Sequence, residues 1–257
     1  MSRILFAGDP HGPLNLHAIA RFAAERRPDA LVLLGDMEVG APLDVEMAAA
    51  LDAGVAVAWI FGNHDGEHGF EVWSDLTDPV ANPRTAGGAL HGRVLEIAGM
   101  RIAGLGGVFR ESVWHPRERD GEPRVRSYAE LARRNERLWP RVWEGKTAAQ
   151  ISSIFPETYE RLSAMKADVL VAHEAPSSHR LGFRVIDELA SAVGARLIVH
   201  GHHHEDYHVV APDAGLEVVG VGLASIVDET GALLVDSGSN ATRSPRLADD
   251  VRWRRVR

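Results

Sequence analysis

A regular interval separates three polar residues near the N-terminus, and it narrows the possible folds more than any other pattern in the chain. Asp9, Asp36 and Asn63 stand 27 residues apart, and each follows an apolar run and a glycine. This interval suits successive strand–helix–strand units of about 30 residues. Parallel strands connected in this way end at one edge of a sheet, so we expect the three loops to lie side by side. The sequence therefore predicts a parallel α/β arrangement.

Two later apolar segments end in histidines. Residues 168–172 lead into His173, and residues 197–199 lead into His200-Gly201-His202-His203-His204. Open α/β folds carry their ligand chemistry in loops that follow the carboxyl ends of strands. We therefore expect five loops to converge on one pair of metal ions. The chain has no cysteine, so its metal ligands must be His, Asp, Glu or Asn.

Hydrophobic periodicity and turn residues predict further elements: helices over 14–26, 43–53 and 184–193, a hairpin over 90–105, and short strands over 207–210, 216–221 and 233–235. The last three strands suggest a closing antiparallel edge. The basic tail, residues 252–257, is expected to be a solvated end, because chain termini often fray.

From about residue 111 to residue 165 the chain becomes arginine-rich and helical in pattern. Ser127–Glu130 and Thr147–Gln150 match the capping box, and Pro156 suits the first turn of a third helix. We expect one domain over residues 1–257, with this segment as a helical insertion beside the site. Its arginines are interpreted mostly as a solvated helix face paired with glutamates. The alternative is a lid whose arginines meet an anionic substrate.

The bulk composition restricts location and partners. The net charge is −8 and the sequence pI is about 5.9, which argues against long nucleic acid as a partner. No stretch approaches the roughly 20 apolar residues of a transmembrane helix. The N-terminal apolar run is too short for a signal peptide. We therefore expect a cytoplasmic protein without a membrane partner.

Taken together, the strand-end motifs resemble those of the calcineurin-like metallophosphoesterase family. The five blocks are Gly8-Asp9-Pro10-His11-Gly12, Gly35-Asp36, Gly62-Asn63-His64-Asp65, His173 and Gly201-His202-His203-His204. They occur in the family's order over about three quarters of the chain, each after a predicted strand. The resemblance implies an α/β fold, a four-layer α/β/β/α sandwich of two mixed sheets. That fold agrees with the strands predicted above.

The resemblance also implies a role for individual residues. The implied ligands are Asp9, His11 and His204 for the first metal, Asn63, His173 and His202 for the second, and Asp36 as the bridge. A hydroxide between the metals would attack phosphorus, since metal binding lowers the pKa of water toward about 7. His64 would protonate the leaving oxygen as general acid, and Asp65 would orient the loop or the imidazole. Mn²⁺ is the expected ion, with Fe or Zn²⁺ as alternatives.

The chain departs from the phosphoprotein phosphatase branch of this family after the bridging residue. That branch carries an Asp three residues further on, followed by an Arg, whereas this chain has Val39 and Gly40. The carboxylate partner of the acid and the phosphate-binding Arg of that branch are therefore missing. Arg110, which follows the glycines of residues 104–107, is the candidate replacement, because a guanidinium suits the geometry of a phosphate. The alternative is a surface arginine that begins the insertion.

The histidines outside the implied ligand set are interpreted individually. His203 stands between two implied ligands and is expected to point away from the metals, while His200 is expected to bond a neighbouring loop. His179 matches no ligand spacing and is interpreted as structural. His68 and His115 are candidates for lining the substrate cleft.

The sequence thus predicts a dinuclear-metal-dependent phosphoesterase. Its substrate would be a phosphomonoester or phosphodiester, in a small molecule or in a phosphorylated macromolecule. One alternative is a nucleotide phosphodiesterase or nuclease on the same fold, and another is a non-catalytic metal-bound scaffold. The complete ligand set and the presence of His64 favour the enzyme, because scaffold relatives usually lose one or the other. The substrate, the oligomeric state and the role of the insertion as lid or interface stay open.

Overall fold

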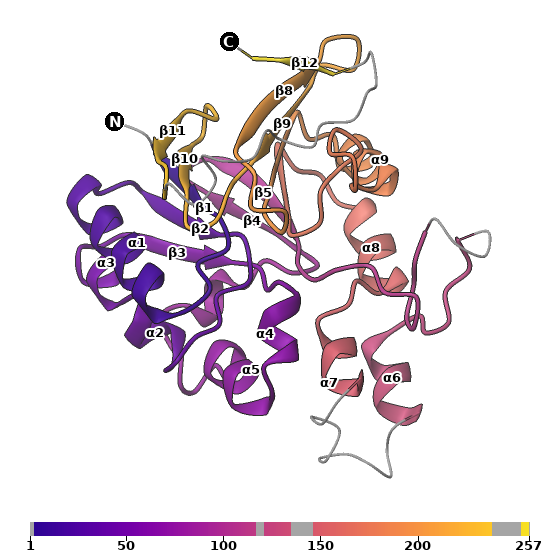
Figure 1. The fold of residues 1–257 in the computed structure, drawn as a ribbon, viewed down its shortest axis with the longest axis horizontal. Helices are drawn as coiled ribbons and strands as arrows, with labels where there is room; N and C mark the ends of the chain where they lie inside the picture. Colours follow the sequence, from indigo (N-terminus) through magenta and orange to yellow (C-terminus); the bar gives the residue numbers. More distant parts are fainter. Residues whose placement is uncertain (1–2, 117–120, 135–145, 238–252, 257) are drawn as a thin grey trace.

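The structure is a computed structural model that describes residues 3–116, 121–134, 146–237 and 253–256. Two mixed sheets form its centre (Figure 1). The first sheet contains β1 (Ile4–Ala7), β2 (Ala30–Leu33), β3 (Ala56–Trp59), β10 (Ile226–Asp228) and β11 (Leu233–Val235). The second contains β4 (Arg93–Ile97), β5 (Met100–Leu105), β6 (Val169–Ala172), β7 (Leu197–His200), β8 (Tyr207–Ala211), β9 (Leu216–Gly220) and β12 (Arg254–Arg255).

The first sheet has the strand order β11-β10-β1-β2-β3. β1, β2 and β3 are parallel, and their registers align Ala7 with Leu33 and Leu33 with Trp59. The loops after these three strands therefore leave the sheet at one edge, which confirms the arrangement predicted from the 27-residue interval. β10 runs antiparallel to β1 and completes the sheet with β11.

The second sheet has the order β12-β8-β9-β7-β6-β5-β4. β5, β6, β7 and β9 are parallel, and Ala172 is aligned with His200 across β6 and β7. His173 and Gly201 consequently leave this sheet at the same edge. The predicted hairpin is present as β4 and β5, where Ala98 and Gly99 both take positive φ, as a two-residue type I′ turn requires.

Helices cover the outer faces of both sheets (Figure 1). They are α1 (Pro13–Arg26), α2 (Leu43–Glu46), α3 (Ala48–Asp52), α4 (Asn63–Glu67), α5 (Phe70–Thr77), α6 (Tyr128–Arg134), α7 (Lys146–Ile151), α8 (Pro156–Ser163) and α9 (Arg184–Val193), with a short 3-10 helix at Ala86–Gly88. α1, α2, α3 and α5 pack on the first sheet, and α8 and α9 pack on the second. Among the described helices, none is long and apolar enough to cross a lipid bilayer. The predicted four-layer α/β/β/α sandwich is confirmed.

Successive side chains of each strand point to opposite faces of its sheet. One face contributes to the inner core between the sheets, and the other to an outer core beneath the helices. In β1, Ile4 and Phe6 point between the sheets, whereas Leu5 and Ala7 point toward the helices. The inner layer also takes valines from β6, β7 and β9, so both sheets present β-branched side chains to each other. Both faces of the central strands are therefore buried, as their continuous apolar runs predict.

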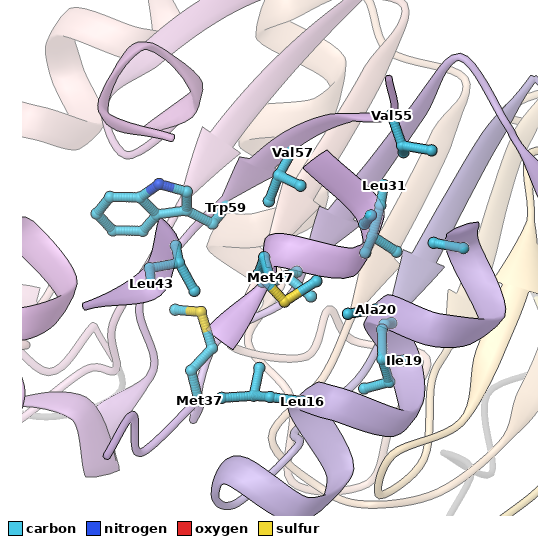
Figure 2. Close-up of a cluster of buried hydrophobic side chains, with 14 of the residues drawn as sticks. Leu16, Ile19, Ala20, Leu31, Met37, Leu43, Met47, Val55, Val57 and Trp59 are labelled. Atoms are coloured by element: carbon cyan, nitrogen blue, oxygen red, sulfur yellow. The ribbon is translucent and has the colours of Figure 1, made fainter. Parts of the chain in front are cut away.

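Figure 2 shows the outer core of the first sheet. Leu16, Ile19 and Ala20 of α1 face Leu31 and the other side chains of the sheet, with methionines filling the space between them. The buried face of α1 is the one predicted from its three- and four-residue spacing. α9 is likewise as predicted and ends at Gly194, whose φ of 83° gives a left-handed cap.

Several elements differ from the sequence expectation. The predicted helix over 43–53 is divided into α2 and α3 at Met47, which takes φ −97° and ψ 10° and is fully buried in the core. The closing edge is split between the sheets, because β8 and β9 join the second sheet and β11 joins the first. β10 was not predicted, since three residues are too few to establish a period.

The described tail residues 254–256 are exposed, as predicted, but two of them pair with the second sheet and do not fray. Arg254 and Arg255 form β12 and pair with Val210 and Val209 of β8. Trp253 is partly buried against the core of the second sheet. The charged side chains of β12 are exposed. The indole of Trp253, directly before them, makes an apolar contact that the basic composition of the tail did not predict.

The described part of the predicted insertion is helical and lies to one side of the sandwich, at the lower right of Figure 1. Val113, Val125, Leu131 and Phe155 form a small core of their own. The capping box at residues 127–130 is present in part, because the Ser127 hydroxyl accepts the Glu130 backbone N–H. α7 begins at Lys146, one residue before the predicted cap. Residues 117–120 and 135–145 of the insertion lie outside the described residues.

The inner core should be the main source of stability. Phe6 is fully buried between the sheets, so Phe6→Ala should lower the free energy of unfolding by about 3–5 kcal/mol. Leu14→Ala is the matched control, because Leu14 is 81% exposed and its loss should cost within about 0.5 kcal/mol. Urea unfolding measures both values. Equal losses for the two variants would contradict the assignment of the inter-sheet layer as the core.

Candidate metal centre

The predicted metal ligands meet at the edge where strands of both sheets end. Each ligand follows the end of β1, β2, β3, β6 or β7, and Asn63 is the first residue of α4. The side chains that the structure brings to this edge are Asp9, His11, Asp36, Asn63, His173, His202 and His204. The parallel strands of two mixed sheets thus bring loops from distant parts of the sequence to one place.

One set of side chains that could hold a cation consists of His11, Asp36 and His204. The Nε2 atoms of His11 and His204 lie 2.9 Å apart, and His11 Nε2 lies 3.9 Å from Asp36 Oδ2. Their imidazole rings meet edge to face, with centroids separated by 4.8 Å. Three donor atoms therefore converge from three separate loops.

A second set consists of Asp36, His173 and His202. His173 Nε2 lies 3.4 Å from Asp36 Oδ2 and 3.3 Å from the side-chain oxygen of Asn63. The other ring nitrogen of His173 donates to the Leu34 carbonyl at 2.8 Å, so Nε2 is the nitrogen that faces the site. Asp36 belongs to both sets, which is the position that a bridging carboxylate requires.

Asp9 lies behind these groups and is fully buried. Its Oδ2 accepts the backbone N–H of His202 at 2.8 Å, whereas its Oδ1 is buried without a hydrogen-bond partner. A buried carboxylate oxygen without a partner is costly unless a cation compensates it. This oxygen, together with imidazole and carboxylate donors on two sides, fits a hard or borderline divalent metal.

The electrostatic environment favours positive charge at this point. Burial raises the pKa of Asp9 well above its usual range, despite the nearby His173. Burial alone would lower the pKa of His173, but the charges of Asp36 and Asp9 outweigh it and raise that pKa to about 10. The two carboxylates thus stabilise a cation between them, whether it is a protonated imidazole or a metal ion.

The two histidines of the last loop are held in their neutral form. Burial, followed by repulsion from His173, lowers the pKa of His202 to about 3. Burial and the neighbouring His11 lower the pKa of His204 to about 4. A metal ligand must carry a free lone pair, so neutral imidazoles bind a cation without first losing a proton.

Backbone strain is concentrated in these loops. Of the nine described non-glycine residues with positive φ, six lie at the site: Asp9, His11, Asp36, Glu38, His202 and His204. A left-handed conformation costs a non-glycine residue about 1–2 kcal/mol and persists only where its surroundings impose it. The strain marks these loops as functional, and it includes Glu38, which the motif analysis did not select.

The loops are packed so closely that glycine is required between them. A Cβ atom on Gly62 would overlap Asp36 Oδ1 and His173 Cε1, and one on Gly35 would lie 2.6 Å from His173 Nδ1. These glycines therefore let the loops after β2 and β3 reach the histidine from the second sheet.

Asp65 was predicted as a catalytic residue that orients either the loop or the imidazole, and its contacts are with the loop. Its Oδ1 accepts the backbone N–H groups of Met37 and Glu38, and its Oδ2 accepts that of Gly62. Burial, followed by the charge of Asp36, raises the pKa of Asp65 to about 6. The fully buried carboxylate thus joins the loops after β2 and β3.

His64, the predicted general acid, begins α4 beside Asn63. Its backbone N–H donates to Asp36 Oδ1 at 2.8 Å, and its ring lies edge-on to His11 with centroids 4.9 Å apart. The ring is partly exposed, and His68, a candidate cleft residue, lies next to it with 3.2 Å between His64 Nδ1 and His68 Nε2. His64 is therefore adjacent to the first set of donors and accessible from outside.

Glu38 is the functional candidate that the sequence analysis missed. It contacts His11, His64 and His68 from one side. Val39 and Gly40, where the phosphatase branch has its Asp and Arg, instead serve packing, because Val39 is buried in the outer core and Gly40 lies against Pro13. The one sequence signal for Glu38 was an isolated acidic residue two positions after Asp36.

Arg110, the predicted substrate-binding residue, lies at the edge of the site and is ion-paired. Its Nη2 is 2.5 Å from Glu67 Oε1, and Glu67 Oε2 lies 3.4 Å from the side-chain nitrogen of Asn63. The pairing orients the amide of Asn63 so that its oxygen faces His173. Arg110 is consequently connected to the second set of donors through one carboxylate.

The insertion contacts the helix that carries Asn63 and His64. The Ser152 hydroxyl is within hydrogen-bonding distance of the Asn63 carbonyl, at 3.1 Å. Gly66 of α4 packs on the same serine, where a Cβ atom would lie 2.7 Å from its hydroxyl oxygen. The insertion therefore packs directly against α4.

A buried polar network supports the histidine loop from behind. His200 Nε2 lies 2.6 Å from the Tyr207 hydroxyl, and its Nδ1 donates to the Gly201 carbonyl. His203 stacks on His179, with ring centroids 3.9 Å apart, and it also belongs to a group with Glu174 and His202 that could hold a cation. Burial lowers the pKa of His200 to about 3, so this ring is a neutral structural partner. His115, the other cleft candidate, lies against Phe183.

A family model described as calcineurin-like phosphoesterase matches residues 2–206 of the chain. The match spans well over half of the sequence and includes every strand-end motif discussed above. The chain belongs to the calcineurin-like phosphoesterase family.

Individual proteins show the same relationship. The chain is 35% identical over 238 residues to an uncharacterized protein of Haemophilus influenzae, covering 91% of this chain and 97% of that protein. Among solved structures, TT1561 of Thermus thermophilus is 18% identical with a TM-score of 0.52, covering 91% of this chain and 97% of that one. A dimetal phosphatase from Danio rerio is 14% identical with a TM-score of 0.52, covering 89% and 93%. At these identities the two structures establish the fold.

The glycine contact between the loops should be essential for metal binding. Gly62→Ala places a methyl group against Asp36 and His173, so we expect it to weaken metal affinity and to cost about 1–3 kcal/mol of stability. Gly87→Ala is the control, because a Cβ there meets no atom within 4 Å. Titration calorimetry with Mn²⁺ and urea unfolding test both variants. Wild-type metal affinity in Gly62→Ala would show that the loops do not need this close approach.

Proposed function

We propose that this chain is a dinuclear-metal-dependent phosphoesterase that hydrolyses a phosphomonoester or a phosphodiester. The observation that carries the proposal is the position of Asp36, whose carboxylate belongs to two donor sets at once. A carboxylate shared in this way is what two cations about 4 Å apart need. Membership of the calcineurin-like phosphoesterase family supports the same conclusion.

The proposed ligands divide between two sites. Asp9, His11 and His204 would hold the first cation, Asn63, His173 and His202 the second, and Asp36 both. Two divalent cations bound there would supply an activated water for attack on phosphorus and would neutralise charge on the phosphoryl oxygens. Imidazole, amide and carboxylate donors suit Mn²⁺, with Fe or Zn²⁺ as alternatives.

His64 is the proposed general acid. Its backbone is fixed by the N–H bond to Asp36, and its partly exposed ring stands beside the first donor set. A leaving oxygen that departs from phosphorus needs a proton, and an imidazole is the side chain best suited to give it near neutral pH. Asp65 would act through the backbone, by holding the loops that carry Asp36 and His64.

Arg110 is the proposed contact to the anionic substrate. Its guanidinium is partly exposed and already meets one carboxylate, that of Glu67, at the side of Asn63. A phosphate group, like a carboxylate, can accept two hydrogen bonds from one guanidinium. The pair with Glu67 would then hold the arginine in place before substrate arrives.

Metal removal and restoration test the function. Protein stripped with a chelator and reloaded with Mn²⁺ should regain hydrolysis of para-nitrophenyl phosphate or of its bis-ester, and Asp36→Ala should lose at least about 100-fold of that activity. Asp213→Ala, an exposed acidic site, is the control. Turnover of the monoester alone identifies a phosphatase, and preference for the diester identifies a phosphodiesterase.

Two outcomes of that assay would favour the other hypotheses. A protein that holds two cations yet cleaves neither ester would favour the non-catalytic scaffold. Diester cleavage whose rate falls steeply with salt would favour a polyanionic substrate such as nucleic acid.

The role of Arg110 has a separate test. Arg110→Ala should raise KM about 10-fold or more with a smaller change in kcat. A contact that stabilises the bound substrate and the transition state equally affects substrate binding and leaves the chemical step unchanged. Arg126→Ala is the matched control, since Arg126 forms an ion pair of the same kind with Glu160 within the insertion. Equal KM values for wild type and Arg110→Ala would exclude Arg110 as the substrate contact.

A further inference from the structure

We infer that Glu38 is a positioning residue for two imidazoles. Its carboxylate orients His11, a proposed ligand of the first cation, and His64, the proposed proton donor. The inference rests on the proposed function and extends it to a residue outside the family motifs. It concerns the direction in which two imidazoles point.

The contacts of Glu38 converge on three rings. Glu38 Oε1 lies 2.5 Å from His11 Nδ1 and 3.2 Å from His64 Nδ1, and Oε2 lies 3.8 Å from His68 Nε2. About a fifth of the Glu38 side chain is exposed, so the carboxylate is mostly enclosed by these rings. One oxygen thus stands between the two imidazoles to which separate roles are assigned.

The contact with His11 determines which ring nitrogen is free. An ionised carboxylate only accepts hydrogen bonds, so His11 Nδ1 must be the donor and carries the proton. His11 Nε2 then keeps its lone pair, and this is the atom that lies 2.9 Å from His204 Nε2 and faces Asp36. A carboxylate behind a ligand histidine fixes the tautomer and strengthens the donor in this way.

The same oxygen, Glu38 Oε1, also lies close to His64. His64 Nδ1 lies 3.2 Å from Glu38 Oε1 and 3.2 Å from His68 Nε2, so both neighbours stand on the Nδ1 side of the ring and Nε2 is the nitrogen left to face a leaving group. The rings of His11 and His64 stand at 89° to each other, and both Nδ1 atoms lie within 3.2 Å of Glu38 Oε1. A single side chain therefore sets the orientation of the donor to the cation and of the donor to the substrate.

The backbone of Glu38 is built to hold it there. Its φ is +46°, a strained value for glutamate, and its N–H donates to Asp65 Oδ1 at 2.9 Å. Asp65 also holds Met37 and Gly62, which fixes the Glu38 loop to the loop that leads into His64. Strain that the surroundings maintain in this way indicates that the position of the side chain matters.

Glu38→Gln tests the inference, because it keeps the shape of the side chain and removes the charge that faces His11 and His64. The first readout needs no activity: titration of the metal-free protein with Mn²⁺ should show about 10- to 100-fold weaker binding of one cation. Glu38→Asp, which keeps the charge on a shorter stem, should restore part of this affinity. Glu71→Gln, an exposed glutamate on α5, is the matched control.

The second readout isolates the contact with His64. At saturating Mn²⁺, Glu38→Gln should lose more kcat on phenyl phosphate esters than on para-nitrophenyl esters, because a poor leaving group depends more on proton donation. In a His64→Ala background the substitution should add no further dependence on the leaving group, since the shared contact is already absent. A merely structural role would lower both rates by the same factor.

Either readout can overturn the inference. Wild-type Mn²⁺ affinity in a folded Glu38→Gln protein would show that Glu38 does not position His11, whatever the activity. An equal loss of kcat on both ester types would show that Glu38 does not position His64. A metal-loaded wild type that cleaves neither ester would instead disprove the proposed function, and the metal titration would still report on His11.

Discussion

The arrangement of the site depends on one buried carboxylate. Asp36 is 1% exposed, accepts the His64 backbone N–H with Oδ1, and presents Oδ2 to His173 and His11. Burial opposes its ionisation, yet His173 and the His64 amide hold the pKa of Asp36 below its usual range. A charge in such a place must be compensated on every side. The loops of both sheets are therefore arranged around this side chain.

Much of this could be predicted from the chain alone, because the informative residues follow regular strands. The interval between Asp9, Asp36 and Asn63 predicted three parallel strands, and the parallel register of β1, β2 and β3 confirms them. His173 and His202 could be placed at the same edge for the same reason, since each follows a short apolar run. A strand end fixes where the next side chains lie, so a motif there predicts a position in space.

The remaining features of the site and the fold could not be predicted. They depend on contacts between segments whose sequences show no hydrophobic periodicity. Glu38 is an isolated acidic residue in a loop, and only the fold brings His11 and His64 to it. Arg110 was selected for its charge, but its partner Glu67 lies 43 residues earlier on another element. Strands as short as β10 and β12 exist because a neighbouring strand offers them hydrogen bonds.

The distribution of the donors along the chain has a consequence for biosynthesis. The first set combines His11 with His204, and the second combines Asn63 with His173 and His202. A nascent chain therefore cannot assemble either set until its last histidine loop has left the ribosome. An N-terminal fragment that ends before this loop lacks His202 and His204, so it cannot offer either complete donor set to a cation.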